Sequence, residues 1–479
     1  MLFFQQYTRF KFSYDNLPSD IIRSCLLYCC LFPKDYGILR RDLIDYWVSE
    51  GFLDNFEDGY TIIGDLFRAC LLEAEDIDSI KLHDVIRDMS LWITCKIEEE
   101  NFLVRTGVGL TEIPKIEEWK GAKRISLMKT KIERQSGIPI CPRLHTLLLT
   151  ASEIEIITDS FFQFMPSLRV LSLNRNRSLT KLPSGISCLV SLQQLDLSVG
   201  KICSLKAYLK ALVNLRYLNL ENTHRMARIP QQMISSFSKL QVLKKMECGL
   251  SADALSLIKE LLCLEHLNHI TLTFESSRAV EFLLKFPKLL SVTQSLSIRS
   301  CKSPAVNVLH LAHMEHLQEL KIDSSNLEEL KIDYAEEVPK VLQSGFCSVH
   351  AVGISFCTVK DLTWLVFAPN LKKIKIVIME CHAMEEIISA EKLSGEVSEI
   401  MGRPNLFAQL ESLTLLGAGN LKSIYRYPLP FPHLKTIRVH GCPKLKKLSL
   451  SSISIKERKI VIDGEKEWWE ELQWEDEAT

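Results

Sequence analysis

Short stretches of alternating apolar residues recur along most of the chain. Each has leucine-like residues in the pattern L-x-x-L-x-L, followed by a small residue eight positions after the first. The clearest copies run from Leu168 to Asn176, from Leu192 to Gly200 and from Leu215 to Thr223. Weaker copies continue to about residue 450, most of them 22 to 27 residues apart. The alternation predicts that each copy begins with a short strand whose leucines point inward.

A period of this length with this leucine spacing is the signature of a leucine-rich repeat. We therefore predict about 13 repeats over residues 122–450. One repeat cannot bury its own leucines, so the whole array is the folding unit. The stacked strands should form a parallel sheet on the concave face of a horseshoe-shaped α/β solenoid.

The small position after each strand is expected to lie inside a turn, where a polar side chain can bond the backbone. Cysteines occupy it at 248, 301, 357 and 442, which accounts for four of the 15 thiols without a metal or a disulfide. Glu275 and Met379 fit this position badly, so their repeats should be irregular. Residues 389–405 interrupt the period and are interpreted as an inserted loop.

The first hundred residues follow a helical period instead. Ser19 or Asp20 can cap a first helix, and Gly51 can end a second. The predicted apolar rows are Ile22, Cys25, Leu26 and Cys29; Leu43, Trp47 and Val48; Ile63, Leu66, Phe67 and Cys70; and, after a strand with Ile80 and Leu82, Val85, Met89 and Trp92. Several short helices with a small strand indicate an α+β domain of winged-helix type.

These patterns divide the 479 residues into four parts. We predict a winged helix over 1–100, a linker or entry to the repeats over 101–121, the repeats over 122–450, and a cap with an acidic tail over 451–479. In the tail, Trp468, Trp469, Leu472 and Trp474 suggest an amphipathic cap on the last repeat, with an exposed interaction tail as the alternative.

Cysteine usage and hydropathy limit the class of protein. An odd number of cysteines in no short-spaced framework indicates reduced thiols in an intracellular protein. Cys25, Cys29 and Cys30 lie too close together for a zinc site and are interpreted as helix core. No apolar run approaches the ~20 residues that span a bilayer.

Charge is distributed unevenly between the first two parts. Residues 1–100 carry 10 Lys and Arg against 19 Asp and Glu, while residues 101–260 carry 23 against 12. Complementary surfaces favour docking, and the candidate basic contacts are Lys123, Arg124, Arg143 and Arg169. The alternative is two ordinary solvated faces. The acidic block also argues against DNA binding by the winged helix, because such binding requires neutralised phosphates.

Several stretches resemble one family. They are CLLYCCLFPKDYGI at 25–38, LIDYWVSEGFLD at 43–54, GDLFRACLLE at 64–73, KLHDVIRDMSLWI at 81–93, GCPKLKKL at 441–448 and WWEELQWEDEAT at 468–479. Over nearly the whole chain they resemble plant disease resistance proteins with a coiled coil, an NB-ARC module and leucine-rich repeats. The resemblance implies an innate immune receptor of the defence and hypersensitive response. Its repeats would recognise a pathogen effector or a guarded host protein and restrain an ADP/ATP-switched NB-ARC module, of which the winged helix is the C-terminal part.

The resemblance also implies a role for two residues. His83 matches the histidine of the family's Met-His-Asp motif, which contacts the diphosphate of ADP, and Asp84 would support it as the helix N-cap. Leu82 replaces the methionine, a mild apolar change. An imidazole donor at a helix start suits phosphate oxygens. An ordinary core or surface histidine is the alternative; adjacent residues make a poor catalytic pair, and nothing completes a metal site.

One departure limits this expectation. The pattern G-x-x-x-x-G-K-S/T, which cradles phosphates in the family, does not occur in the sequence. We therefore expect an N-terminally truncated chain, whose binding of ADP or ATP is doubtful and whose oligomerisation would need the full-length receptor. We expect no enzymatic activity and no nucleic-acid partner. The cytoplasm is the expected location, with the inner plasma membrane as an alternative.

A second hypothesis needs no nucleotide. A truncated chain could still bind a protein on the concave face of its repeats. The outward positions include Arg216, Tyr217, Lys372, Lys373, Lys375, Lys435 and Arg438. The later residues of this set favour an acidic partner, and a merely solubilising face is the alternative.

Overall fold

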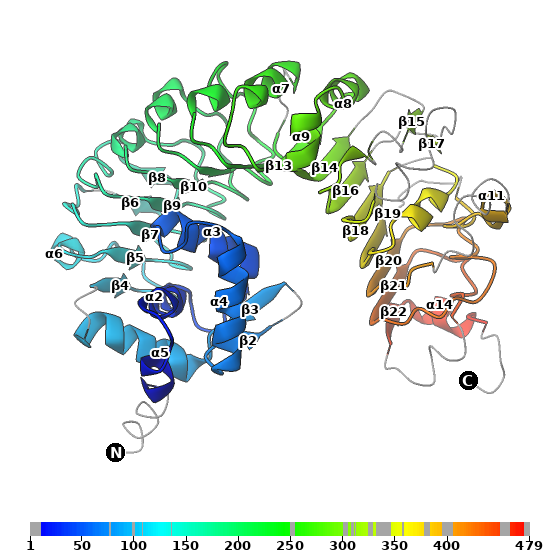
Figure 1. Ribbon diagram of the computed structural model, residues 1–479, viewed down its shortest axis with the longest axis horizontal. Helices are drawn as coiled ribbons and strands as arrows, with labels where there is room; N and C mark the ends of the chain where they lie inside the picture. The colour runs from blue at the N-terminus through cyan, green and yellow to red at the C-terminus, as the bar shows by residue number, and fades with distance from the viewer. Residues whose placement is uncertain are drawn as a thin grey trace. The chain divides into compact units, whose positions relative to one another are not determined.

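The computed structural model describes residues 11–75, 78–97, 101–107, 109–135, 137–249, 254–299, 305–307, 311, 313–323, 329–331, 346–356, 359–377, 384–394, 406–450 and 460–473. They fall into two compact units, Met1–Asn268 and His269–Thr479. Figure 1 labels the helices and strands of each. In the part of the chain that is described, no helix is both long enough and apolar enough to cross a membrane.

The first unit begins with the winged helix, as predicted. Its helices are α2 (Asp20–Tyr28), continued by the short η1 (Cys29–Leu31), α3 (Arg40–Glu50), α4 (Glu57–Arg68) and α5 (Asp84–Trp92), which runs into the π-helical turn η2 (Ile93–Ile97). The strands β1 (Ile38–Leu39), β2 (Glu73–Ala74) and β3 (Ser79–Lys81) form an antiparallel sheet in the order β1-β3-β2.

Local signals set the ends of two of these helices where the sequence predicted them. The Ser19 hydroxyl accepts a hydrogen bond from the Ile22 N–H at 3.2 Å and caps α2. Gly51 ends α3 with a φ of 85°, a left-handed conformation that glycine adopts without strain.

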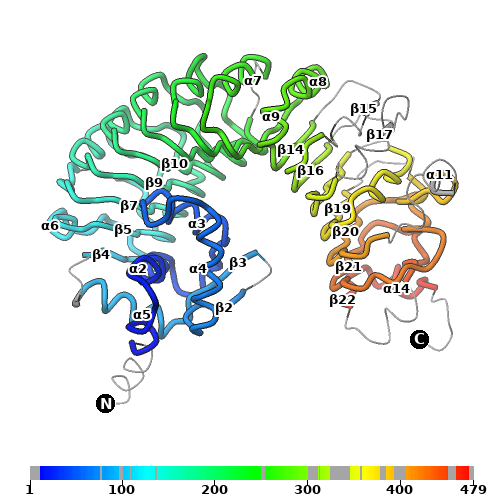
Figure 2. Tube along the Cα trace, viewed as in Figure 1, coloured from blue at the N-terminus to red at the C-terminus, as the bar shows by residue number. Residues whose placement is uncertain are grey.

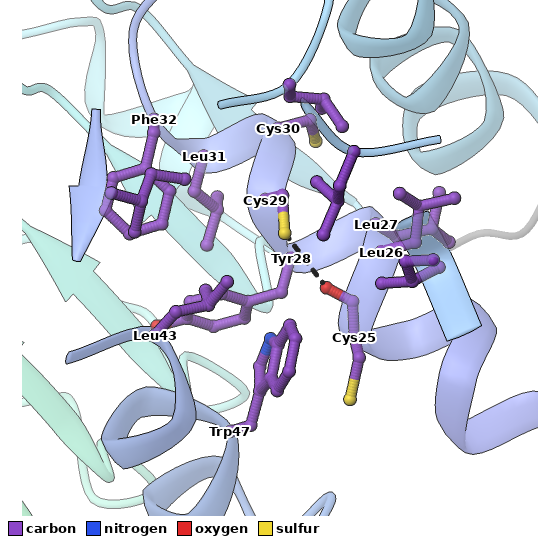
Figure 3. Packing of buried hydrophobic residues seen from close by; sticks show 14 of the residues in the cluster. Cys25, Leu26, Leu27, Tyr28, Cys29, Cys30, Leu31, Phe32, Leu43 and Trp47 are labelled. Atoms are coloured by element: carbon purple, nitrogen blue, oxygen red, sulfur yellow. Dashed lines mark hydrogen bonds between the residues drawn. The ribbon is translucent and has the colours of Figure 1, made fainter. Parts of the chain in front are cut away.

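The cysteines of α2 and η1 lie in the core. Cys25, Cys29 and Cys30 are fully buried among Leu26, Trp47 and their neighbours (Figure 3). Burial raises the pKa of the Cys25 thiol well above its usual value. The interpretation of these thiols as core residues is confirmed.

Two predicted apolar rows are partly wrong. Cys70 lies beyond the end of α4, with a φ of 56°, and is exposed. In α5 the buried apolar residues are Ile86 and Met89, whereas Trp92 is 40% exposed. The helix begins at Asp84, and this start turns Ile86, rather than Val85 or Trp92, toward the core.

The repeats of the first unit share one parallel sheet. Its strands, in spatial order, are β4 (Phe102–Val104), β5 (Arg124–Ser126), β7 (Thr146–Leu148), β9 (Val170–Ser172), β10 (Gln194–Asp196), β11 (Tyr217–Asn219) and β12 (Val242–Lys245). Their central leucines are in register, with Leu195 between Leu171 and Leu218. The segment predicted to be a linker thus already contains the first strand of the sheet.

Shorter elements connect these strands. They are α6 (Ile116–Trp119), the paired strands β6 (Arg134–Gln135) and β8 (Ile156–Ile157), the 3-10 turns η3 (Ser184–Cys188), η4 (Ala207–Ala211) and η5 (Ile234–Ser236), and α7 (Ala254–Leu262). Successive strands, each with its connecting segment, stack in chain order, as the tube in Figure 2 shows for this unit.

After several of the described strands the small position lies inside the turn, as predicted. The Asn176 amide donates to the carbonyls of Leu149, at 2.7 Å, and Leu173, at 2.9 Å. Its oxygen accepts from the N–H groups of Ser152 and Ile154. Thr223, Cys248 and Cys442 are also buried at this position; Cys301, Cys357 and Met379 lie outside the described residues.

The second unit continues the same pattern of parallel strands. In spatial order its strands are β13 (His269–Phe274), β14 (Thr293–Arg299), β16 (Glu319–Asp323), β18 (Ala351–Ser355), β19 (Lys373–Val377), β20 (Ser412–Leu416), β21 (Thr436–His440) and β22 (Val461–Gly464). The predicted leucine-rich-repeat solenoid is therefore present in both units.

The connections of the second unit are more varied. They include α8 (Ser277–Leu283), α9 (Pro287–Val292), the paired strands β15 (Ala305–Asn307) and β17 (Glu329–Lys331), η7 (Thr363–Phe367) and α11 (Ala390–Ser394). Glu275, the poorly fitting residue, is exposed between β13 and α8. Of the predicted inserted loop, α11 lies in the described part and 395–405 lie outside it.

The tail helix α14 (Lys466–Glu470) packs on the last repeats. The Trp468 ring N–H donates to the Leu445 carbonyl at 2.7 Å, and only 5% of Trp468 is exposed. The ring covers Gly464, where a Cβ would come within 2.5 Å of it. Leu472 is buried and Trp469 is 46% exposed, so one side of the helix covers apolar residues; Trp474 lies outside the described residues.

Candidate functional site

His83 occupies the N-cap position of α5. Its backbone is extended, with φ −59° and ψ 142°, and its ring Nδ1 accepts a hydrogen bond from the Val85 N–H at 3.3 Å. A neutral ring that accepts at Nδ1 carries its proton on Nε2. The exposed side chain of His83 therefore presents an N–H donor to its surroundings.

Asp84 is the first residue of α5 rather than its cap, so the prediction of Asp84 as N-cap is wrong. Its carboxylate forms an ion pair with Lys34, and a negative charge in a first helical turn is favourable. The other carboxylate oxygen, Oδ1, is buried without a hydrogen-bond partner. Asp84 thus supports the helix start from within its first turn and does not pair with His83.

The His83 ring is a suitable donor for a phosphate group, but a single donor is too few to hold a nucleotide. His83 offers one donor at the start of a nine-residue helix, where the dipole favours an anion, but the Val85 N–H of the first turn is already bonded to the His83 ring. A nucleotide needs several such donors, because fixing it costs translational and rotational freedom. In the described residues, no three His, Cys, Asp or Glu side chains gather as they would around a metal ion.

A larger arrangement of charges lies where α3 meets the first repeats. Glu50, the last residue of α3, has a fully buried carboxylate. Arg124 of β5 binds it with both arms of its guanidinium, Nε to Oε1 at 3.1 Å and Nη2 to Oε2 at 2.9 Å. Thr146 of β7 donates its hydroxyl to the same carboxylate, and Arg169 donates to the Glu50 backbone carbonyl at 2.7 Å.

Aromatic side chains surround this ion pair. The Arg124 guanidinium lies 5.0 Å from the ring centre of Phe52 and 5.2 Å from that of Phe102. The Tyr28 hydroxyl is 3.4 Å from that of Thr146. Flat, weakly hydrated guanidinium groups suit such dry, aromatic sites better than lysine does.

One apolar core joins the winged helix to the repeats. It combines residues of α2, α3, α4 and α5 with Met128, Leu148 and Val170 of the repeats. All three residues of β5, β7, β9, β10 and β11 are consequently buried on both faces. In Figure 1, α2 and α3 lie against this side of the first unit's sheet.

A second buried charge sits farther along the same sheet. Lys244 of β12 lies 3.0 Å from Asp42 and 3.4 Å from Asp45, both on α3, and its side chain is 7% exposed. Its ammonium is also 5.0 Å from the centre of the Tyr217 ring. Two separate turns of α3 are therefore held by cations of the repeats.

Burial affects the two partners in different ways. It raises the pKa of Asp45 to about 6, against the opposing charge of Lys244. Burial also opposes the charge of Lys244, yet Asp42, together with Tyr217 and Asp45, holds the pKa of Lys244 well above its usual value. Lys244 therefore stays protonated, with Asp42 as its closer partner.

Sequence reasoning found only part of this contact. Of the predicted basic residues, Arg124 and Arg169 contact α3, Lys123 is half-buried and Arg143 is exposed. The prediction that Tyr217 is exposed on the concave face is wrong, because only 4% of this residue is exposed. The sequence did not predict the contact of Lys244 with α3. A signal was present, because the neighbouring Lys245 occupies a position that is a buried leucine in other repeats, and it too is buried.

Two family descriptions match the chain. The disease resistance protein winged helix domain matches residues 31–90, and the leucine-rich repeat matches residues 142–200. These matches agree with the domain that carries α3 and with the sheet that binds it. The architecture is thus that of a leucine-rich-repeat protein with a winged helix of the disease resistance type.

Curated relatives cover nearly the whole chain. Disease resistance protein RPS5 of Arabidopsis thaliana is 40% identical over 98% of this chain and 54% of its own length. Disease resistance protein SUMM2 of the same plant is 41% identical over 98% of this chain and 54% of its own. The chain is similar to these plant disease resistance proteins over nearly its whole length and spans about half the length of the relatives.

Solved structures align with the chain at low similarity. An internalin from Listeria monocytogenes aligns with 75% of this chain and 90% of its own, at 16% identity and a TM-score of 0.42. The leucine-rich-repeat assignment therefore rests on the repeat pattern and the family match rather than on this alignment.

Proposed function

We propose that the chain is the regulatory and recognition half of a plant immune receptor. The repeats bind a pathogen effector or a guarded host protein, and they restrain an ADP/ATP-switched NB-ARC module through its winged helix. Binding of the partner to the repeats loosens the winged helix and permits nucleotide exchange and, in a full-length receptor, assembly. The proposed role is binding rather than catalysis, and the proposed location is the cytoplasm, with the inner plasma membrane as an alternative.

The buried ion pair between Glu50 and Arg124 carries this proposal. Removing one partner of such a pair typically lowers stability by about 3–5 kcal/mol, because the other charge is left buried and unpaired. Such a contact is stable while the ion pair is formed and unstable when the pair is broken but the charges remain buried. It therefore suits a restraint with two states, docked and released.

His83 has the nucleotide-sensing role in this proposal. Its outward Nε2–H would donate to the diphosphate of ADP when the domains that carry the P-loop are present. Asp84 would keep the helix start in place through Lys34. Whether these 479 residues bind ADP by themselves is tested by a thermal-shift measurement with ADP, on the wild type and on His83→Ser.

Charge reversal tests the restraint. Arg124→Glu places a second carboxylate beside Glu50, and Arg169→Glu removes the bond to its carbonyl. Both should speed cleavage by trypsin or Glu-C between residues 97 and 124 at least about tenfold, as expected for the loss of a charged hydrogen bond. Arg143→Glu, an exposed arginine of the same repeats, is the matched control.

The interpretation of the result depends on the fold staying intact. Circular dichroism and a cooperative melting transition establish this for each variant. Unchanged cleavage in a folded Arg124→Glu protein would contradict the restraint. Equal acceleration by Arg143→Glu would show that general charge, not this contact, controls the junction.

A nucleotide-independent binding module is the second candidate. The outward basic residues of the second unit favour it, because they are exposed whether or not the winged helix is docked. Partner binding that is the same in wild type and in Arg124→Glu would support this candidate over a coupled receptor.

A further inference from the structure

In the first unit the winged helix covers one face of the sheet. In the second unit the corresponding face is exposed. Along β19 and β21 the inward residues are buried and the others are exposed or half-exposed. In β5, β7, β9, β10 and β11 every residue is buried, because the winged helix lies on this part of the sheet. A partner that uses an open sheet face therefore finds one in the second unit.

Three outward residues form a row across this face. Lys375 of β19 pairs in register with Thr414 of β20, which pairs with Arg438 of β21. Strands of a sheet are about 4.8 Å apart, so the Cα atoms of Lys375 and Arg438 lie roughly 10 Å apart with Thr414 midway. The two cations are exposed and the threonine between them is half-exposed.

The residues around this row increase its positive charge. Lys372, Lys373 and Lys435 are exposed beside it. The nearest acidic side chains are already engaged, with Glu411 2.7 Å from Lys435 and Asp463 3.7 Å from Arg438. Arg438 contacts Asp463 through Nε, and its guanidinium carries further N–H donors.

A second row offers a different chemistry. Two residues farther along each strand, Val377 pairs with Leu416, which pairs with His440. All three are half-buried. Positions two apart on a strand are separated by about 6.6–7 Å, so the apolar pair Val377 and Leu416 lies at that distance from the basic row.

We propose that Lys375, Thr414 and Arg438 bind a carboxylate of a partner protein, whose next-but-one residue is apolar and contacts Val377 and Leu416. The two cations and the threonine hydroxyl donate to the carboxylate oxygens. Residues i and i+2 of an extended segment have the same spacing as the two rows. This inference names the partner class for the repeats and rests on their proposed role in binding a protein.

The surface suits an acidic protein segment better than a nucleic acid. Nucleic-acid affinity grows with the number of phosphates that Lys and Arg neutralise. Here Glu411 and Asp463 lie among the cations, and Val377 and Leu416 in the adjoining row are apolar. Both features would weaken binding of a continuous polyanion and are compatible with a single carboxylate.

A labelled peptide tests the proposal on the full chain. The probe is fluorescein-labelled Gly-Ser-Glu-Gly-Leu-Gly-Glu-Gly-Leu-Ser, followed by fluorescence anisotropy, and its Gln-for-Glu counterpart is the control probe. Lys375→Glu and Arg438→Glu should each weaken binding at least about tenfold, as for loss of a charge-assisted hydrogen bond. Thr414→Glu, which places a carboxylate in the site itself, should do the same.

Lys447→Glu is the matched control variant, since it makes the same change at an exposed lysine of the same unit. Little change in this variant, together with the losses above, supports the proposal. Absence of binding by the wild type, equal weakening by Lys447→Glu, or equal binding of the Gln-containing probe would overturn it. Tighter binding of a single-stranded DNA 10-mer through the same residues would assign the surface to nucleic acid instead.

Two further measurements separate this proposal from others. If Glu475→Gln/Asp476→Asn/Glu477→Gln binds the probe more tightly, the acidic tail of the same chain competes with the probe, and this result supports carboxylate recognition at the site. The trypsin pattern of each variant shows whether the winged helix remains docked. Failure of peptide binding with an unchanged pattern contradicts only this inference and leaves the restraint standing.

Discussion

Asn176 shows how one polar residue can stabilise two neighbouring repeats. It is 1% exposed and makes four hydrogen bonds with backbone groups on either side of its turn. A buried backbone group without a partner costs about 1–3 kcal/mol. The sequence could predict this role because the bonded groups lie within one repeat of the asparagine.

Asn176→Ala should lower the free energy of unfolding by about 3 kcal/mol, because two carbonyls and two N–H groups lose their partner. Urea unfolding measures the change. The control is Asn214→Ala, which removes a single exposed bond to the Val190 carbonyl and should cost about 0.5 kcal/mol or less. Equal losses in the two variants would contradict the role assigned to Asn176.

His83 combines a structural bond with an exposed donor. His83→Ala removes the acceptor of the Val85 N–H and should lower stability by about 0.5–1 kcal/mol, whereas His83→Ser, a preferred N-cap, should restore it. Thermal unfolding of the three proteins checks this order. A serine variant no more stable than the alanine variant would show that the cap contributes little.

At the scale of elements, α3 is the helix on which the contact with the repeats depends. Its sequence suggested an amphipathic helix ending at Gly51, which is correct. The carboxylates of Asp45 and Glu50 nevertheless lie buried on the side that faces the sheet. A helical period predicts buried apolar residues, but it does not predict that a charged residue will be buried when its partner comes from another domain.

The pH dependence of stability should report on Asp45. Burial raises the pKa of its carboxyl from 3.8 to about 6 in the folded protein. The folded state thus binds this proton more tightly, so the stabilising contribution is complete below about pH 3.8 and is lost as the pH rises through 6. The shift of 2.2 pKa units, from 6 − 3.8, corresponds to at most about 3 kcal/mol.

Asp45→Asn removes this titration. From pH 4.5 to 7.5 the wild type should therefore lose about 2 kcal/mol of stability relative to the variant. Urea unfolding at several pH values measures the difference, with Asp54→Asn, an exposed aspartate of the same domain, as the control. A difference that stays constant with pH would show that Asp45 keeps its charge when buried.

At the scale of the whole molecule, the two units should respond separately to local damage. Repeats contact mainly their neighbours, so a disturbance fades along the array. Arg124→Ala leaves Glu50 buried without its partner, and Trp468→Ala removes a ring that covers Gly464. Each should loosen its own unit by roughly 3–5 kcal/mol.

Hydrogen exchange followed by mass spectrometry checks this prediction. Arg124→Ala should speed exchange in α3 and in β5 to β9, and leave β20 to β22 unchanged. Trp468→Ala should have the opposite pattern. Faster exchange throughout the chain in either variant would mean that the two units unfold as one.

The repeats themselves were determined by the sequence. Leucines at fixed spacing within about 24 residues of one another bury each other wherever the chain stacks, so strand, turn and register follow from local pattern. The capping residues Ser19 and Gly51 are local in the same sense, because each bonds or bends the backbone next to it.

Only the tertiary structure decided which charges meet. Glu50 and Arg124 are 74 residues apart, and Lys244 and Asp42 are 202 apart. Net charge favoured docking of the two regions, yet it could not select Arg124 and Arg169 over Arg143. That choice depends on how α3 is turned against the sheet, which is set by the shared core of α2, α3 and the first strands rather than by the pattern of any one segment.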